Sequence, residues 1–202
     1  MPHGAVGACP HSNGTRLSVH YLAFLRRRIR GCADQKNPAM KSPIDQLIEW
    51  LNSAYSMEVS LAQVLENHAN DAEDVPELQN RMQQHAVDTR RHAEVLVECL
   101  MVLGEKPSIA KAVMGNVMRR VQGLSTGLFN DQLVKNALAD YASEHFEIAC
   151  YRSLIAAADA VGQPEVAELC EQNLRDEQEM AEWLEEQIPE LTRLFLQQEA
   201  AR

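Results

Sequence analysis

Acidic and imidazole side chains stand where the apolar stripes of several predicted helices would normally continue. In the first helix, leucines at three- and four-residue spacing lead to Glu58, and in the second His85 and His92 interrupt a similar stripe. Glu144 and Glu177 hold comparable positions in the third and fourth helices. An ionised carboxylate in a protein core is destabilising unless it is paired or coordinates a cation. Because all four helices carry such a residue near mid-length, the pattern predicts that these groups converge on bound metal ions.

Two further candidate ligands lie one helical turn from these residues. Asp88 shares a face with His85, and Glu147 shares one with Glu144, because side chains at i and i+3 are neighbours on a helix. Ferritin-like di-metal sites take one Glu from each of two helices and an i, i+3 pair from each of the other two. The sequence therefore predicts a metal site formed by Glu58, His85, Asp88, Glu144, Glu147 and Glu177.

The residue types in this set also favour particular metals. Oxygen-rich ligand sets with one or two imidazoles suit iron or manganese better than copper or zinc. Bridging carboxylates would hold two cations close enough to act together on dioxygen or peroxide. The expected cofactor is therefore a dinuclear iron or manganese centre.

Capping signals and helix breakers divide residues 40–202 into the elements that must position this site. Ser42 before Pro43 is the expected N-cap of the first helix, and prolines and glycines mark the later boundaries. The predicted helices cover about residues 42–67, 76–103, 131–161 and 164–188, and Pro189 separates a short terminal helix.

The connection between the second and third helices decides the topology. Residues 105–130 are less regular, and a connection of roughly 25 residues is longer than an up-down-up-down bundle needs. We therefore predict an all-α fold, a ferritin-like four-helix bundle with a long crossover and a short C-terminal helix.

Composition and charge narrow the classes of function. Hydrophobic residues make up 46% of the 202 residues and aromatic ones 5%, which favours a helical globular protein. A net charge of −10 argues against nucleic-acid binding, and no apolar run is long enough to cross a membrane. The five cysteines show no CxxC pairing, which is typical of a reducing compartment and predicts a cytoplasmic protein.

Residues 1–39 differ from the remainder of the chain. They carry six basic side chains and a single acid, Asp34. An Arg-rich, acid-poor end is compatible with a targeting peptide. We favour instead a basic extension that is disordered or is non-native sequence upstream of a start at Met40, followed by one helical bundle domain over residues 40–202.

Four short motifs carry a resemblance to a known family: Tyr55-x-x-Glu58, His85-x-x-Asp88-Thr89, Glu144-His145-x-Glu147-Ile148-Ala149-x-Tyr151 and Leu174-x-Asp176-Glu177. Over about residues 43–188 the chain resembles the YciE/YciF-like ferritin-like family, which has no well-defined reaction. The resemblance implies a ferritin-like bundle with a dinuclear metal centre. It also implies a homodimer and an association with stress responses.

The chain departs from this family pattern at three places. His92 stands where the family usually has a Gln-like residue, and Ala181 stands where relatives are often acidic. The pair His85 and Asp88 reverses the usual Glu-x-x-His order. These departures leave open whether one or two ions bind, and whether His92 is an additional ligand or a partner of one.

Several neighbouring residues have simpler interpretations. Tyr55 and Tyr151 are expected in the core, where a hydroxyl could hydrogen-bond a ligating carboxylate. His145 is expected to face outward or to support a ligand, because Glu144 and Glu147 occupy the inward face.

Three functions fit the sequence. The first is a redox or metal-handling protein, which as an enzyme would be a di-metal oxidoreductase acting on peroxide or dioxygen. The second is a non-catalytic dimeric interaction module with a vestigial metal site. The third is an iron store, which would require a closed shell of subunits.

Overall fold

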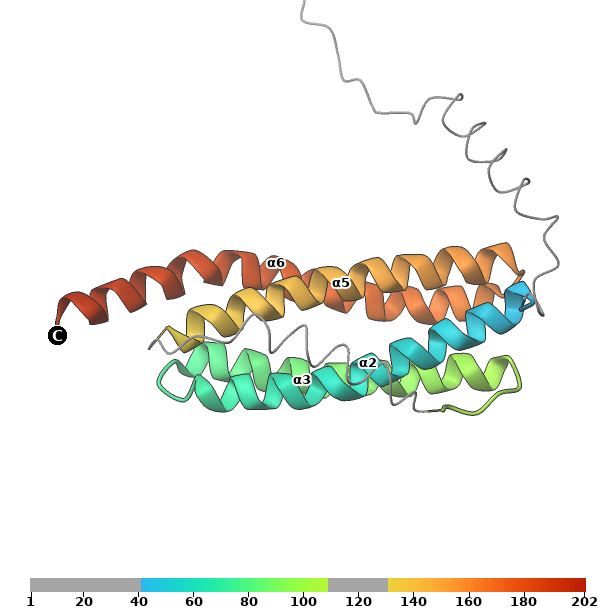
Figure 1. The fold of residues 1–202 in the computed structure, drawn as a ribbon, viewed down its shortest axis with the longest axis horizontal. Helices are drawn as coiled ribbons and strands as arrows, with labels where there is room; N and C mark the ends of the chain where they lie inside the picture. The colour runs from blue at the N-terminus through green and yellow to red at the C-terminus, as the bar shows by residue number, and fades with distance from the viewer. Residues whose placement is uncertain (1–40, 109–130) are drawn as a thin grey trace, which may run out of the picture. The chain divides into compact units, whose positions relative to one another are not determined.

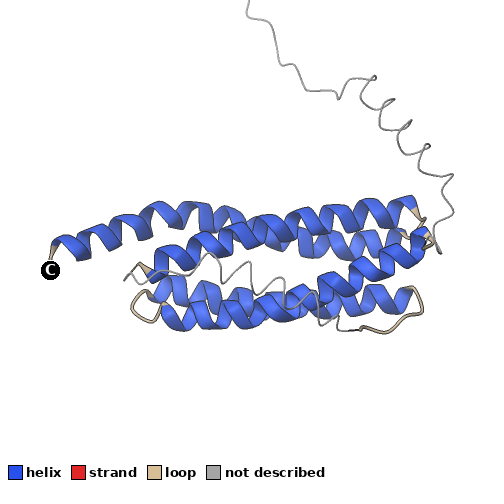
Figure 2. Ribbon diagram, in the orientation of Figure 1, coloured by secondary structure: helices blue, strands red, loops and turns tan. Residues whose placement is uncertain are grey.

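The computed structural model describes residues 41–108 and 131–202, which contain four long α-helices (Figures 1 and 2). The expectation for residues 1–39 and most of that for 105–130 fall outside the described residues. The helices are α2 (Pro43–Asp71), α3 (Pro76–Val102), α5 (Gln132–Ala160) and α6 (Pro164–Ala200). No strand occurs in these two stretches, so the all-α prediction is confirmed.

The helices form two antiparallel hairpins packed against each other. α2 and α3 make the first hairpin and α5 and α6 the second, and α3 also packs against α6 and α2 against α5. In Figure 1, α3 ends at the right of the bundle whereas α5 begins at the left. The chain between α3 and α5 therefore joins opposite ends of the bundle, which confirms the crossover of a ferritin-like topology.

The helix boundaries follow the local signals in the sequence. The Ser42 hydroxyl accepts from the Asp45 N–H at 3.2 Å, while the Asp45 carboxylate accepts from the Ser42 N–H at 3.1 Å, so the predicted N-cap is a full capping box. Gly104 (φ 77°) and Gly162 (φ 73°) adopt the left-handed conformation just beyond α3 and α5. A non-glycine side chain would be strained at these two positions, which explains why the helices end there.

The last helix is longer than the sequence predicts. α6 continues through Pro189 to Ala200 instead of ending near Ile188. Proline cannot donate a hydrogen bond to the carbonyl four residues earlier. The turns beyond it nevertheless bury Leu191 against the core at 6% exposure, and this tertiary packing outweighs the local loss.

Two apolar clusters lie towards opposite ends of the bundle. The first apolar cluster includes Leu47, Leu51, Leu96, Tyr151 and Cys170, and the second includes Leu65, Leu78, Met82, Met180 and Leu184. Along the helices the candidate ligands fall between the residues of these two clusters, except that His85 directly precedes Ala86 of the second cluster. The fold therefore places a polar layer in the interior, flanked by apolar packing. None of the described helices is long and apolar enough to span a membrane.

Candidate metal centre

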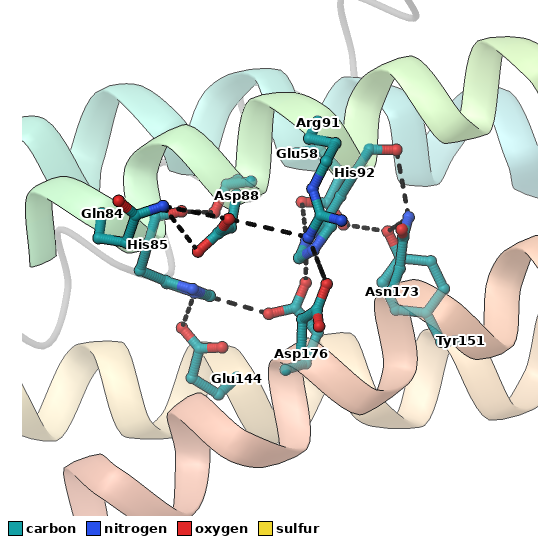
Figure 3. A network of polar contacts seen from close by, with 12 residues as sticks. Glu58, Gln84, His85, Asp88, Arg91, His92, Glu144, Tyr151, Asn173 and Asp176 are labelled. Atoms are coloured by element: carbon teal, nitrogen blue, oxygen red, sulfur yellow. Dashed lines mark hydrogen bonds and ion pairs between the residues drawn. The ribbon is translucent and has the colours of Figure 1, made fainter. Parts of the chain in front are cut away.

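Four helices contribute polar side chains to the buried layer. Glu58 comes from α2, His85 and His92 from α3, Glu144 from α5 and Glu177 from α6, and each is at most 2% exposed. His85 and His92 are seven residues apart, which is two helical turns, so both point inward from one face of α3. Figure 3 shows His85 directed at Glu144 across the bundle.

The ligand atoms gather into two overlapping groups. Glu58, His92 and Glu177 form one group, and His85, Glu144 and Glu177 form the other, with the atoms in each group lying within 4.8 Å of one another. We call these the His92 group and the His85 group. Glu177 belongs to both, which is the arrangement expected of a carboxylate that bridges two ions.

Short contacts between imidazoles and carboxylates connect the groups. Glu177 Oε1 lies 2.7 Å from Nδ1 of His92, and its Oε2 lies 3.6 Å from Nε2 of His85. The same His85 nitrogen lies 3.1 Å from Oε1 of Glu144. The two imidazole ring centres are 6.4 Å apart, less than the rise of two helical turns, so the rings lean towards each other over the bridge.

Several buried carboxylate oxygens lack a protein partner. Oε2 of Glu58, Oε2 of Glu144 and Oε1 of Glu147 have no hydrogen-bond partner among the described residues. Orphaned acceptors of this kind are rare in native interiors because each is costly to desolvate. These oxygens lie at or beside the two donor groups, and metal ions would satisfy them.

Burial and mutual repulsion raise the pKa values of three carboxyl groups in the layer. Burial, together with the charge of Glu177, raises the pKa of Glu58 to about 8. Burial and the same charge hold the pKa values of Glu144 and Glu147 well above their ordinary range. In the absence of a cation the layer therefore keeps several carboxyl groups protonated at neutral pH, and binding a cation would displace those protons.

The pKa values of the two histidines shift in opposite directions. Burial, the larger effect, lowers the pKa of His85 to about 4, so this imidazole is neutral and free to act as a ligand. Burial acts in the same sense on His92, but the carboxylates of Glu177 and Glu58 raise its pKa to about 9. Burial alone would raise the pKa of Glu177, and the His92 imidazole lowers it instead. His92 and Glu177 thus form an ion pair at the position of the bridge.

A hydrogen-bonded support orients the His92 group (Figure 3). The Tyr151 hydroxyl donates to Glu58 Oε1 at 2.5 Å, and the Asn173 amide donates to that hydroxyl at 2.9 Å. Asn173 also donates to the backbone carbonyl of His92 at 3.2 Å, and Asp176 lies 3.1 Å from Nε2 of the same histidine. Such partners fix the rotamer of a ligand.

The remaining predicted ligands, Asp88 and Glu147, are placed differently. Asp88 is half-buried, with the Gln84 amide 3.4 Å and the Arg91 guanidinium 3.7 Å from its oxygens, and neither donor group found among the described residues includes it. Glu147 is 3% exposed and feels the charges of Glu58, Glu144 and Glu177, although it is in neither group.

Other residues of the sequence argument also have defined places. His92, left open by the sequence, lies in a donor group, whereas His145 is exposed and packs edge-on against Tyr141. Tyr55 packs against the first apolar cluster, and Tyr151 lies within it. Asn173 was not predicted from the sequence. Its position four residues before Glu177 on α6 was the available signal, because i and i+4 share a helix face.

The crossover bundle and its buried carboxylate–imidazole layer define a ferritin-like four-helix protein with a group of candidate metal ligands. Residues 42–197 match the family described as a domain of unknown function, DUF892. The chain belongs to that family, and the YciE/YciF-like resemblance is confirmed.

Solved structures support the same fold. A protein from Xanthomonas campestris is 34% identical, with 78% of this chain and 98% of that one covered at a TM-score of 0.67. The Escherichia coli stress protein YciF is 22% identical over 76% and 99% of the two chains, with a TM-score of 0.68. Rhodobacter capsulatus bacterioferritin, determined with a metal-free dinuclear site, is 21% identical over 74% and 88%, with a TM-score of 0.59.

Proposed function

We propose that this protein binds a dinuclear non-haem iron or manganese centre and uses it in oxidant or metal handling. The observation that carries the proposal is the sharing of Glu177 between two donor groups contributed by all four helices. A single bridging carboxylate with one imidazole and one further carboxylate on each side is a ligand set suited to a pair of such ions.

The ligand roles follow from the two groups. Glu58 and His92 would hold one ion, His85 and Glu144 would hold the other, and Glu177 would bridge them. We propose Glu147 as a further ligand because it is buried beside these carboxylates and has an unpartnered oxygen, and Asp88 as an outer one. When bound, a metal pair supplies redox chemistry towards dioxygen or peroxide.

The protein's own side chains would prepare the layer for such chemistry. Tyr151 and Asn173 fix Glu58, and Asp176 fixes His92. The apolar clusters on both sides exclude bulk water, which strengthens the electrostatic interactions inside. Bacterioferritin, which shares the fold, has a dinuclear site, and YciF is a stress protein, so both are consistent with this proposal.

Metal analysis with matched variants tests the proposal. Protein purified without chelator and titrated anaerobically with Fe²⁺ or Mn²⁺ should bind two ions per chain by element-resolved mass spectrometry. The double variant Glu58→Gln/Glu144→Gln should lose this binding and keep its helicity. Glu182→Gln/Glu186→Gln removes the same charge from exposed positions on α6 and should bind like the wild type.

A different result would favour the interaction module. Wild-type protein that binds neither ion, with a stability unchanged by the buried double substitution, would mean that the site is vestigial.

We also propose that the protein is a homodimer. Leu138, an apolar side chain on the outside of α5, is 48% exposed. A second copy would cover it. Sedimentation velocity should show a dimer for the wild type and a monomer for Leu138→Lys.

A further inference from the structure

A file of buried polar residues on α5 leads from one end of the bundle to the candidate centre. Gln132, Asn136, Asp140 and Glu144 follow one another at four-residue spacing, so they share one face of the helix. Asn136 and Asp140 are only 4% and 3% exposed. We call these four residues the α5 file.

Hydrogen bonds connect the α5 file to the end of α2. The Gln132 amide donates to Asn136 Oδ1 at 2.7 Å, and the Asn136 amide donates to Asp71 at 2.9 Å. His68 Nδ1 lies 2.7 Å from Oδ1 of Asp140. Asn136 and Asp140 therefore each have a polar partner on α2.

These polar groups occupy an otherwise apolar region. A cavity of about 10 Å³ has room for about one water molecule, and it is lined by three polar residues and by apolar ones: His68, Asn136, Asp140, Leu78, Met82, Leu133 and Ala137. Burying a carboxyl group among such neighbours is costly, and burial raises the pKa of Asp140. An apolar side chain would pack there at lower cost, so packing does not account for Asp140.

The inner end of the α5 file is part of the candidate centre. Glu144 is the next residue of the stripe after Asp140, and its Oε2 has no hydrogen-bond partner among the described residues. Glu147, with an unpartnered Oε1, lies one turn further. The outer end of the α5 file is more exposed than the inner end. Gln132 is half-buried there, and the His68 side chain beside Asp140 is 11% exposed.

We propose that Asp140, with His68 and Asn136, is a transit site through which divalent cations reach the candidate centre from the end of the bundle where α5 begins. The inference rests on the proposed function. Carboxylate, amide and imidazole groups are the ligands that such cations accept in exchange for water. The cavity beside Asp140 has room for about one water molecule, and therefore for a cation that has exchanged its water for these groups.

The transit role predicts a particular kinetic signature. A cation passes the same residues on its way in and on its way out, so loss of the Asp140 charge raises the barrier in both directions. Uptake and release should slow by similar factors, so the equilibrium affinity should change much less than either rate. A ligand of the final site would behave differently, because its loss accelerates release and weakens affinity.

The probe is Co²⁺, whose visible absorption reports its binding. Stopped-flow mixing measures uptake, and mixing of the loaded protein with excess EDTA measures release. In Asp140→Asn, both rates should fall by about ten-fold or more. Asp159→Asn, an exposed position at the other end of α5, makes the same charge change and should leave both rates unchanged.

A second variant protects the test against misfolding of the first. Asn136→Ala removes the amide group from the file without adding bulk and should also slow both rates. Unchanged rates in both variants, or faster release with weakened affinity in Asp140→Asn, would overturn the transit role while leaving the centre intact. Failure of the wild type to bind Co²⁺, Fe²⁺ or Mn²⁺ would instead overturn the proposed function.

Discussion

The two hairpins have the same architecture but contribute different chemistry to the buried layer. Both second helices open with Pro-Glu, at Pro76-Glu77 and at Pro164-Glu165. The first hairpin supplies both imidazoles and one carboxylate, whereas the second supplies three carboxylates and no imidazole. The second hairpin therefore carries acids that repel one another, and the first carries the groups that can compensate them.

The contacts between the hairpins follow from this difference. The three shortest His–Glu contacts in the layer join His85 to Glu144, His85 to Glu177 and His92 to Glu177, and each crosses from one hairpin to the other. The same side chains that would hold the metals therefore join the hairpins in the metal-free protein. Substitutions in the layer should affect metal binding and hairpin pairing together, and unequally on the two sides.

The largest effect should come from the residue that the two donor groups share. Glu177→Gln keeps the shape of the side chain but removes the bridging charge, so we expect the loss of both ions. Anaerobic Mn²⁺ titration followed by element analysis would show less than a tenth of the wild-type metal, roughly, since removing one partner of a buried charge network costs about 3–5 kcal/mol. Glu186→Gln, exposed on the same helix, is the control. Retention of two ions by Glu177→Gln would contradict the bridge.

A single substitution in the His92 group or in the His85 group should remove one of the two ions. Glu58→Gln removes a ligand of the His92 group, and Glu144→Gln removes one of the His85 group. Each variant should therefore retain one ion of the pair. Electron paramagnetic resonance of Mn²⁺-loaded protein should show a coupled pair in the wild type and isolated ions in each variant. A coupled pair in either variant would mean that the removed carboxylate is not a ligand.

A smaller effect is expected from the support of Glu58. Tyr151→Phe removes only the hydroxyl that donates to this carboxylate. Loss of such an orienting partner typically weakens metal affinity by about 10–100-fold. Isothermal titration with Mn²⁺ should show the weakening for one of the two ions, with the stoichiometry unchanged. Tyr55→Phe, half-buried beside the first apolar cluster, should leave both affinities as they are.

Much of the fold could be predicted from local signals in the sequence. The capping box at Ser42 and the glycines at 104 and 162 act within a few residues of the helix ends, so the sequence contains the whole cause. Pro189 misled the prediction because the α6 turns beyond it are stabilised by packing of Leu191 against other helices. That contribution comes from residues distant in the sequence.

The candidate site could likewise be predicted only in part. Periodicity places Glu58, Glu144 and Glu177 on inward faces, and the structure brings all three into the donor groups. Spacing alone could not separate His92 from Asp88, because the rotation of α3 about its own axis decides which of them faces the bridge. The role of Asn173 depends on Tyr151 of another helix, and a single-helix pattern contains no such information.

The smallest expected effect is the pH dependence of the metal-free protein, and it tests how the charge of Glu177 in the second hairpin acts on Glu58 and His92 in the first. Glu58 has a raised pKa of about 8 in the folded state, so its contribution to stability is fully present below the unfolded value of 4.5 and is lost as the pH rises through 8. The pKa of His92 is raised to about 9, so its contribution to stability is lost as the pH rises through 9. His85 is already neutral in both states above about pH 7 and contributes nothing to the slope there.

The free energy of unfolding in chelator should therefore fall by about 1 kcal/mol or more between pH 7 and pH 9. Urea titrations followed by circular dichroism would measure it. Glu58→Gln should make the slope less steep because glutamine does not titrate, and the contribution of His92 should remain. Saturating Mn²⁺ should reverse the slope, because ligand deprotonation then favours the metal-bound fold. A metal-free protein whose stability is constant or rises over this range would mean that Glu58 is not held protonated in the layer.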